Sequence, residues 1–259
     1  MSEPAVFVSH GSPMAALEIG AYQDALAAFG QRNRPQAVVV VSAHWETGRE
    51  VKVASAERQH LIYDFGGFPR QLYEVQYPAV GAPAAAQRVA ELLAAAGVRV
   101  ELDAERGLDH GVWVPLSLMF PQVDVPVVAL PVPMLMTPSE LVRVGEALRP
   151  LREEGVMILG SGGIVHNLRR LNWNRRQAPV EGWAAEFDTW FAEKLEAWDV
   201  PALARYAQDA PQAQWAVPTT EHFHPVFVTL GAAGERPQVE WIHQGFEYGT
   251  LSMRSFALR

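Results

Sequence analysis

Ala37-Val38-Val39-Val40-Val41 is the stretch of sequence that decides the fold. Five consecutive apolar residues, four of them valine, fit a short strand that is covered on both faces. Such strands belong to mostly parallel sheets with helices packed against both sides. Ser42-Ala43-His44-Trp45 follows directly, so this strand leads into a histidine.

Strand-like and helix-like segments alternate on both sides of this run. The patterns predict further strands over residues 5–8, 51–54, 98–102, 125–132, 156–159, 239–243 and 251–256. They predict helices over residues 14–29 (closed by Gly30), 82–96, 112–119, 138–151, 181–195 and 203–207, and from near 221 through 232. Residues 63–77 read as an aromatic binding loop. We expect an α/β fold, a single domain over residues 1–259 with a central, mostly parallel or mixed sheet flanked by helices.

Composition excludes several classes of function. The formal net charge of −8 argues against a nucleic-acid partner. The absence of cysteine excludes disulfides, cysteine nucleophiles and thiolate metal sites, so any metal must be held by histidine nitrogen and carboxylate oxygen. We see no signal peptide at the N-terminus, and the apolar runs are far shorter than a membrane span. The expectation is a soluble, cytoplasmic protein without a membrane partner.

Six of the eight histidines lie in five segments that are turns punctuated by glycine or proline, or strand ends. They are His10, His44, His110, His166 and the pair His222 and His224. In open α/β sheets the functional crevice lies at the carboxyl ends of the strands, where His10, His44 and His166 fall. We expect the strands over residues 5–8 and 37–41, which lead into His10 and His44, to be neighbours in the sheet. Several imidazoles at one such edge make a metal site or an acid–base site.

Other interpretations of these motifs stay open at this level. Gly160-Ser161-Gly162-Gly163 could cradle a phosphate, although it lacks the pattern of a P-loop or a dinucleotide fingerprint. Ser12 and Ser161 lie outside the Gly-x-Ser-x-Gly pattern of serine hydrolases. Asp109 could orient His110 or only cap the following helix. We interpret His60 and His243 as structural, and we expect only one of His222 and His224 to enter a common site.

A larger set of motifs occurs in one order along nearly the whole chain. The set is Ser9-His10-Gly11-Ser12-Pro13, Ser42-Ala43-His44-Trp45, Asp64-Phe65-Gly66-Gly67-Phe68-Pro69, Tyr77-Pro78-Ala79, Asp109-His110-Gly111-Val112-Trp113, Ser161-Gly162-Gly163-Ile164-Val165-His166-Asn167-Leu168 and Glu221-His222. This ordered set resembles the DOPA-dioxygenase-type (LigB-like) branch of the class III extradiol ring-cleaving dioxygenases.

The resemblance implies a mononuclear divalent metal and assigns roles to five histidines. His10, His44 and His222 match the positions that bind metal, and His166 matches a further ligand or the catalytic base. His110 matches a histidine beside the substrate. Many members use two histidines and a glutamate, whereas the third position here is His222, with Glu221 next to it as an alternative carboxylate ligand. Fe(II) is expected for dioxygenase activity, and three histidines also suit Zn(II).

The implied substrates are a small aromatic catechol, DOPA-like or otherwise substituted, and O₂. Ring opening needs a base near neutrality that removes a hydroxyl proton, a role we give to His166, and an acid that returns a proton, a role we give to His110. Two alternatives remain. One is a zinc-dependent hydrolase that uses the same histidines, and the other is a non-enzymatic metal- or ligand-binding protein.

Overall fold

The polyvaline run lies inside the main sheet of the protein, as the sequence predicted. The computed structural model describes residues 2–259. Its strands are β1 (Ala5–Ser9), β2 (Ala37–Thr47), β3 (Val51–Ala54), β4 (Val100–Asp103), β5 (Val127–Pro133), β6 (Val156–Gly162), β7 (Val239–His243), β8 (Phe246–Glu247), β9 (Leu251–Ser252) and β10 (Ser255–Leu258). Six of them form the sheet β5-β2-β6-β1-β10-β7. The first four are mutually parallel, and β10 runs antiparallel to both of its neighbours, β1 and β7, so the expected mixed sheet is confirmed.

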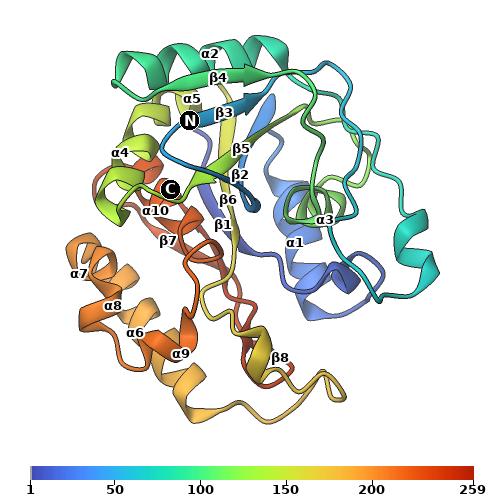
Figure 1. Ribbon diagram of the computed structural model, residues 1–259, viewed down its shortest axis with the longest axis vertical. Coiled ribbons are helices and arrows are strands. Elements are labelled where there is room, and N and C mark those ends of the chain that lie inside the picture. The colour runs from blue at the N-terminus through green and yellow to red at the C-terminus, as the bar shows by residue number, and fades with distance from the viewer. Residues whose placement is uncertain (1) are drawn as a thin grey trace.

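Helices cover both faces of this sheet (Figure 1). They are α1 (Ala21–Arg32), α2 (Pro83–Ala95), α3 (His110–Met119), α4 (Pro138–Leu148), α5 (Pro150–Glu153), α6 (Gly182–Glu196), α7 (Val200–Ala204), α8 (Tyr206–Asp209), α9 (Ala213–Ala216) and α10 (Pro225–Ala233). The small pair β3-β4 continues the layer near α2, and β8-β9 forms a short hairpin. No helix within residues 2–259 combines the length and the apolar character needed to cross a membrane.

Strand β2 shows why the valine run is continuous. Val39 and Val41 belong to the core beneath α2, α4, α6 and α10, whereas Val38 and Val40 belong to the core beneath α1 and α3. All four are at most 2% exposed. Because successive side chains of a strand point to opposite faces, a strand buried on both faces needs an apolar residue at every position.

The helix predicted over residues 14–29 is wrong at both ends. A 3₁₀ helix over Pro13–Ala16 comes first, and α1 starts only after Gly20 and continues through Gly30. Gly30 is buried where α1 meets α3, and a Cβ there would lie 1.9 Å from the Met119 carbonyl oxygen. This glycine therefore serves the close approach of two helices rather than the end of one.

Three further sequence expectations need correction. The helix over 138–151 is two helices, because Pro150 starts α5 after α4 has ended. The closing strand over 251–256 is divided between β9 and β10. Strands β1 and β2 are not neighbours as expected, since β6 lies between them. That insertion brings the ends of three strands, rather than two, to one place.

Candidate active site at the carboxyl edge of the sheet

Three adjacent parallel strands deliver most of the candidate residues to one edge. His10 directly follows β1, His44 lies near the end of β2, and His166 comes four residues after β6. Since β1, β6 and β2 run in parallel, their carboxyl ends meet there. His222 comes from the turn before α10, a helix that packs against β1 and β6.

Gly162 allows this turn to reach the edge of the sheet. A Cβ at Gly162 would lie 2.0 Å from the His222 carbonyl oxygen, which is itself bonded to the Gly163 backbone N–H at 2.8 Å. The backbone of His222 therefore lies so close to the end of β6 that only glycine fits at position 162. This packing explains the glycines of the segment without a bound phosphate.

We expect Gly162→Ala to displace His222 and to weaken metal binding by at least about tenfold, because the added Cβ collides with backbone that cannot rotate away. Gly182→Ala is the matched control, since a Cβ at Gly182 meets nothing within 4 Å. Thermal unfolding and metal titration of both variants provide the check. A Gly162→Ala protein as stable and as metal-competent as the Gly182→Ala protein would contradict this reading of the turn.

Three imidazoles converge through the same ring atom. The Nε2 atom of His44 lies 3.1 Å from Nε2 of His10 and 3.2 Å from Nε2 of His222. His10 and His222 are 1% and 7% exposed. His10, His44 and His222 thus form a group whose nitrogens could ligate one metal ion.

The opposite nitrogen of each of these rings has an oxygen partner. Nδ1 of His10 lies 2.9 Å from Oγ of Ser161, and Nδ1 of His222 lies 3.0 Å from Oε1 of Glu221. Nδ1 of His44 lies 3.3 Å from Oδ2 of Asp64. The single Ser161 hydroxyl proton is donated to the Gly111 carbonyl, so its oxygen accepts from His10.

These partners assign the tautomers. A carboxylate or a serine oxygen that accepts from Nδ1–H leaves Nε2 with a lone pair. Three lone pairs then point toward one another at about hydrogen-bond distance with no proton between them. Such an arrangement is unfavourable without a cation, and three neutral imidazole nitrogens are a donor set that could bind one.

Burial keeps these three rings in the neutral form that a metal requires. Burial, and then the neighbouring histidines, lower the pKa values of His10 and His222 well below the usual range. Burial, followed by the nearby His110, lowers the pKa of His44 to about 3. Neutral imidazoles at neutral pH need lose no proton before they bind a metal ion.

His110 is held by Asp64. One Asp64 oxygen accepts from the His110 backbone N–H and from Nδ1, each at 3.0 Å. Burial by itself would raise the pKa of Asp64, but the hydrogen bond and the charge of His110 outweigh burial and bring the pKa to about 2. The same carboxylate therefore orients His110 and His44.

Asp109 does neither of the things that we considered for it. Its side chain makes no capping bond to α3, and it accepts instead from Ser42 Oγ at 2.6 Å and Arg106 at 2.8 Å. Burial raises the pKa of this carboxyl group. Through Ser42, Asp109 holds the end of β2 in place. The carboxylate that orients His110 belongs to Asp64, in a different loop.

His166 lies beside the trio rather than in it. Its ring stacks on His222 with centroids 3.5 Å apart and an interplanar angle of 9°. The atoms close enough for a shared ion group His166 with Glu221 and His222, not with His10 and His44. Burial lowers its pKa to about 4, so it is an unprotonated ring at the edge of the site.

The remaining histidines lie elsewhere. His224 is buried at the N-cap position directly before α10, and its Nδ1 has no hydrogen-bond partner, so only His222 of this pair lines the cavity. His60 is exposed and packs against Gly107, and His243 is the last residue of β7. Neither belongs to the imidazole cluster, in agreement with their structural interpretation.

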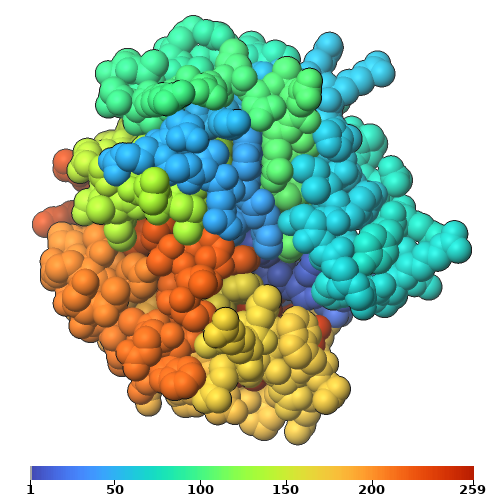
Figure 2. All heavy atoms as spheres, viewed as in Figure 1, coloured from blue at the N-terminus to red at the C-terminus, as the bar shows by residue number. Residues whose placement is uncertain are grey.

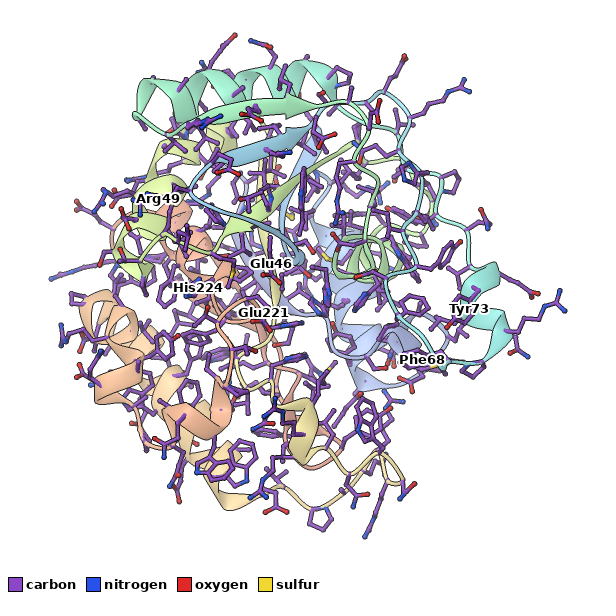
Figure 3. All side chains as sticks on the ribbon, viewed as in Figure 1. Glu46, Arg49, Phe68, Tyr73, Glu221 and His224 are labelled. Atoms are coloured by element: carbon purple, nitrogen blue, oxygen red, sulfur yellow. The ribbon has the colours of Figure 1, made fainter. Side chains whose placement is uncertain are left out.

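A cavity of about 240 Å³ opens over the imidazoles. Its polar end is lined by the five histidines, Ser12 and Asp64, and its other walls are apolar. On the face in Figure 2 the surface is hollowed where the dark-blue N-terminal segment meets cyan, yellow and orange atoms. In Figure 3, Phe68 and Glu221 lie on opposite sides of this region, Glu221 near the centre of the molecule.

The sequence did not reveal the side chains that orient the cluster. It suggested Ser161 only as a nucleophile and Glu221 only as a metal ligand, whereas in the structure both bond to the Nδ1 atoms of histidines. Asp64 carried one signal, its place in Asp64-Phe65-Gly66-Gly67-Phe68-Pro69, a glycine-containing loop of the kind that holds functional residues.

Comparisons with known proteins agree with this geometry. Residues 4–258 match the sequence model of a family described as the catalytic LigB subunit of aromatic ring-opening dioxygenase. A 4,5-DOPA dioxygenase extradiol of Beta vulgaris is 39% identical over 96% of this chain and 94% of its own length. One of Escherichia coli (strain K12) is 41% identical over 97% and 93%. The crystal structure of an uncharacterized protein of Escherichia coli K12 superposes with a TM-score of 0.84 at 35% identity, covering 99% of this chain and all of that one.

Proposed function

We propose that this member of the family of the catalytic LigB subunit of aromatic ring-opening dioxygenases opens a substituted catechol, of the DOPA type or another. The chain belongs to that family and is an extradiol ring-opening dioxygenase. The proposed site of the reaction is one divalent metal ion held by His10, His44 and His222. The observation that supports this most is the convergence of three Nε2 lone pairs. Hydrogen bonds to Ser161 and Glu221 fix that tautomer for His10 and His222, and the Asp64 carboxylate 3.3 Å from Nδ1 of His44 favours it there.

The donor set fits such an ion. Three neutral imidazoles leave positions open on one side, toward the cavity, and the carboxylates of Asp64 and Glu221 balance part of the added charge from behind the rings. We propose Fe(II) as the working metal because a bound ferrous ion supplies the Lewis acidity and redox chemistry that oxygen insertion needs. Zn(II) suits the same three nitrogens and is the proper comparison.

The two other histidines have the geometry for proton transfer. His166 is neutral and lines the cavity, so it can take the proton of a catechol hydroxyl. His110 has its Nδ1 committed to Asp64, which leaves Nε2 as its working nitrogen. A proton carried on Nε2 of His110 can be returned to the opened product while Asp64 holds the ring from Nδ1.

The test is anaerobic loading with Fe(II), removal of excess metal, and addition of a catechol panel and O₂. We expect a coloured ring-opened product with Fe(II) and rates lower by at least about 10²-fold with Zn(II), because zinc has no redox chemistry. The absence of ring opening across the panel, with one iron shown to be bound per chain, would defeat the proposal. Esterase or amidase turnover by the zinc form alone would favour the hydrolase alternative.

A further inference from the structure

The cavity has a sharply divided wall. Its inner end is the imidazole cluster, and its outer end is formed by two loops that carry apolar side chains. One loop contributes Phe65 and Phe68, and the other contributes Leu168, Leu171 and Trp173. Phe68 lies on the arm at the right of Figure 3. A ring whose two hydroxyl groups face the imidazoles would place its substituent between these loops.

No lysine or arginine occurs among the fifteen described residues that line this cavity. Three arginines of the same loops have other partners: Arg70 pairs with Glu74, Arg170 lies over the Trp215 ring, and Arg176 pairs with Glu18 and Glu247. Arg169 lines a separate groove with Glu181, and Arg175 is exposed. Among the described residues, the outer end of the cavity therefore has no cation that could pair with a carboxylate substituent.

The charge balance points the same way. The chain carries a formal net charge of −8, so the protein outside the metal site does not attract an anion. An anionic substituent would lose water against phenyl and leucine side chains without gaining an ion pair. An alkyl substituent would gain by leaving water for the same surface.

Resting on the ring-opening function proposed above, we infer that this site prefers catechols whose ring substituent is uncharged and apolar over catechols that carry a carboxylate. The inference narrows the substrate class from substituted catechols to alkyl- or aryl-substituted ones. It assigns the discrimination to the wall formed by the two loops, not to the imidazole cluster.

The test compares 4-ethylcatechol with 3,4-dihydroxyphenylacetate, which have substituents of similar size and opposite character. For the Fe(II)-loaded protein we expect kcat/KM to favour 4-ethylcatechol by about tenfold or more. Dissociation constants measured by calorimetry with the Zn(II)-loaded protein should show the same order, which separates binding from turnover. Equal or better binding of the carboxylate by the wild-type chain would overturn the inference.

A charge introduced at the wall sharpens the test. Leu168 is 50% exposed, so Leu168→Lys is compatible with folding. We expect Leu168→Lys to reduce the preference for 4-ethylcatechol by about fivefold or more, whereas Leu168→Gln, polar but uncharged, should not. A Leu168→Lys protein with the wild-type preference would contradict the assignment to this wall. Should neither compound be opened, the proposed function fails, and the calorimetric ratio still decides the preference.

Discussion

His44→Ala is expected to abolish binding of the single metal ion and to lower ring-opening activity by on the order of 10³-fold or more. His44 is the shared member of the trio, since its Nε2 is the atom close to both His10 and His222. Its loss removes one of the three proposed nitrogen ligands and also frees one Asp64 oxygen. Metal content after anaerobic Fe(II) loading and steady-state kinetics measure the two effects.

His60→Ala is the matched control for that variant. It removes an exposed histidine outside the cluster, so one metal ion per chain and the wild-type activity should be retained. Thermal unfolding of both variants without metal excludes a general loss of fold as the cause. If His44→Ala still bound one iron ion per chain and turned over at the wild-type rate, the three-histidine site would be wrong.

His166→Gln should show a different pattern, in which the metal stays and the chemistry slows. The ring stacks on His222 but lies outside the group formed by His10, His44 and His222. Removing a general base typically costs about 10²- to 10⁴-fold in rate, and we expect kcat to fall within that range while iron binding stays within about threefold. The readouts are iron affinity, kcat and the pH profile.

The pH profile distinguishes a base from a structural residue. A base acts in its unprotonated form, so the wild-type rate should fall as the pH drops through the pKa of that base in the substrate complex. In His166→Gln this acidic limb should disappear or shift, whereas a merely structural loss would lower the rate equally at every pH. Loss of the metal from His166→Gln would instead make His166 a ligand.

Much of the fold could be predicted because local patterns suffice for buried parallel strands. The valine run of β2 and the run of β6 were placed correctly since each is apolar at every position. The errors have a common cause. Gly30, Pro150 and the β1–β6–β2 order depend on what packs against a segment, and a single sequence does not contain that information locally.

The residues of the candidate site likewise fall into those that local sequence could identify and those that it could not. Histidines at strand ends could be found because their positions follow from the strands themselves. Ser161 and Asp64 could not be assigned, because their role depends on rings that are distant in the chain, and Glu221 could not be assigned because the sequence does not show which nitrogen of the adjacent His222 it faces. Ser161 and His10 are 151 residues apart in the chain, yet 2.9 Å apart in space. Only the folded chain shows that Ser161 holds the His10 ring and that Asp64 holds the His110 ring, each from another part of the chain.

The central claim is that a catechol is opened beside its hydroxyl groups at the trio of His10, His44 and His222. The most direct measurement is mass spectrometry of the product formed by Fe(II)-loaded protein from 4-ethylcatechol under ¹⁸O₂. We predict an extradiol product that contains both labelled oxygen atoms and that does not form when His44→Ala replaces the wild-type chain. An unlabelled product, cleavage between the two hydroxyl-bearing carbons, or the same labelled product from His44→Ala would contradict the account.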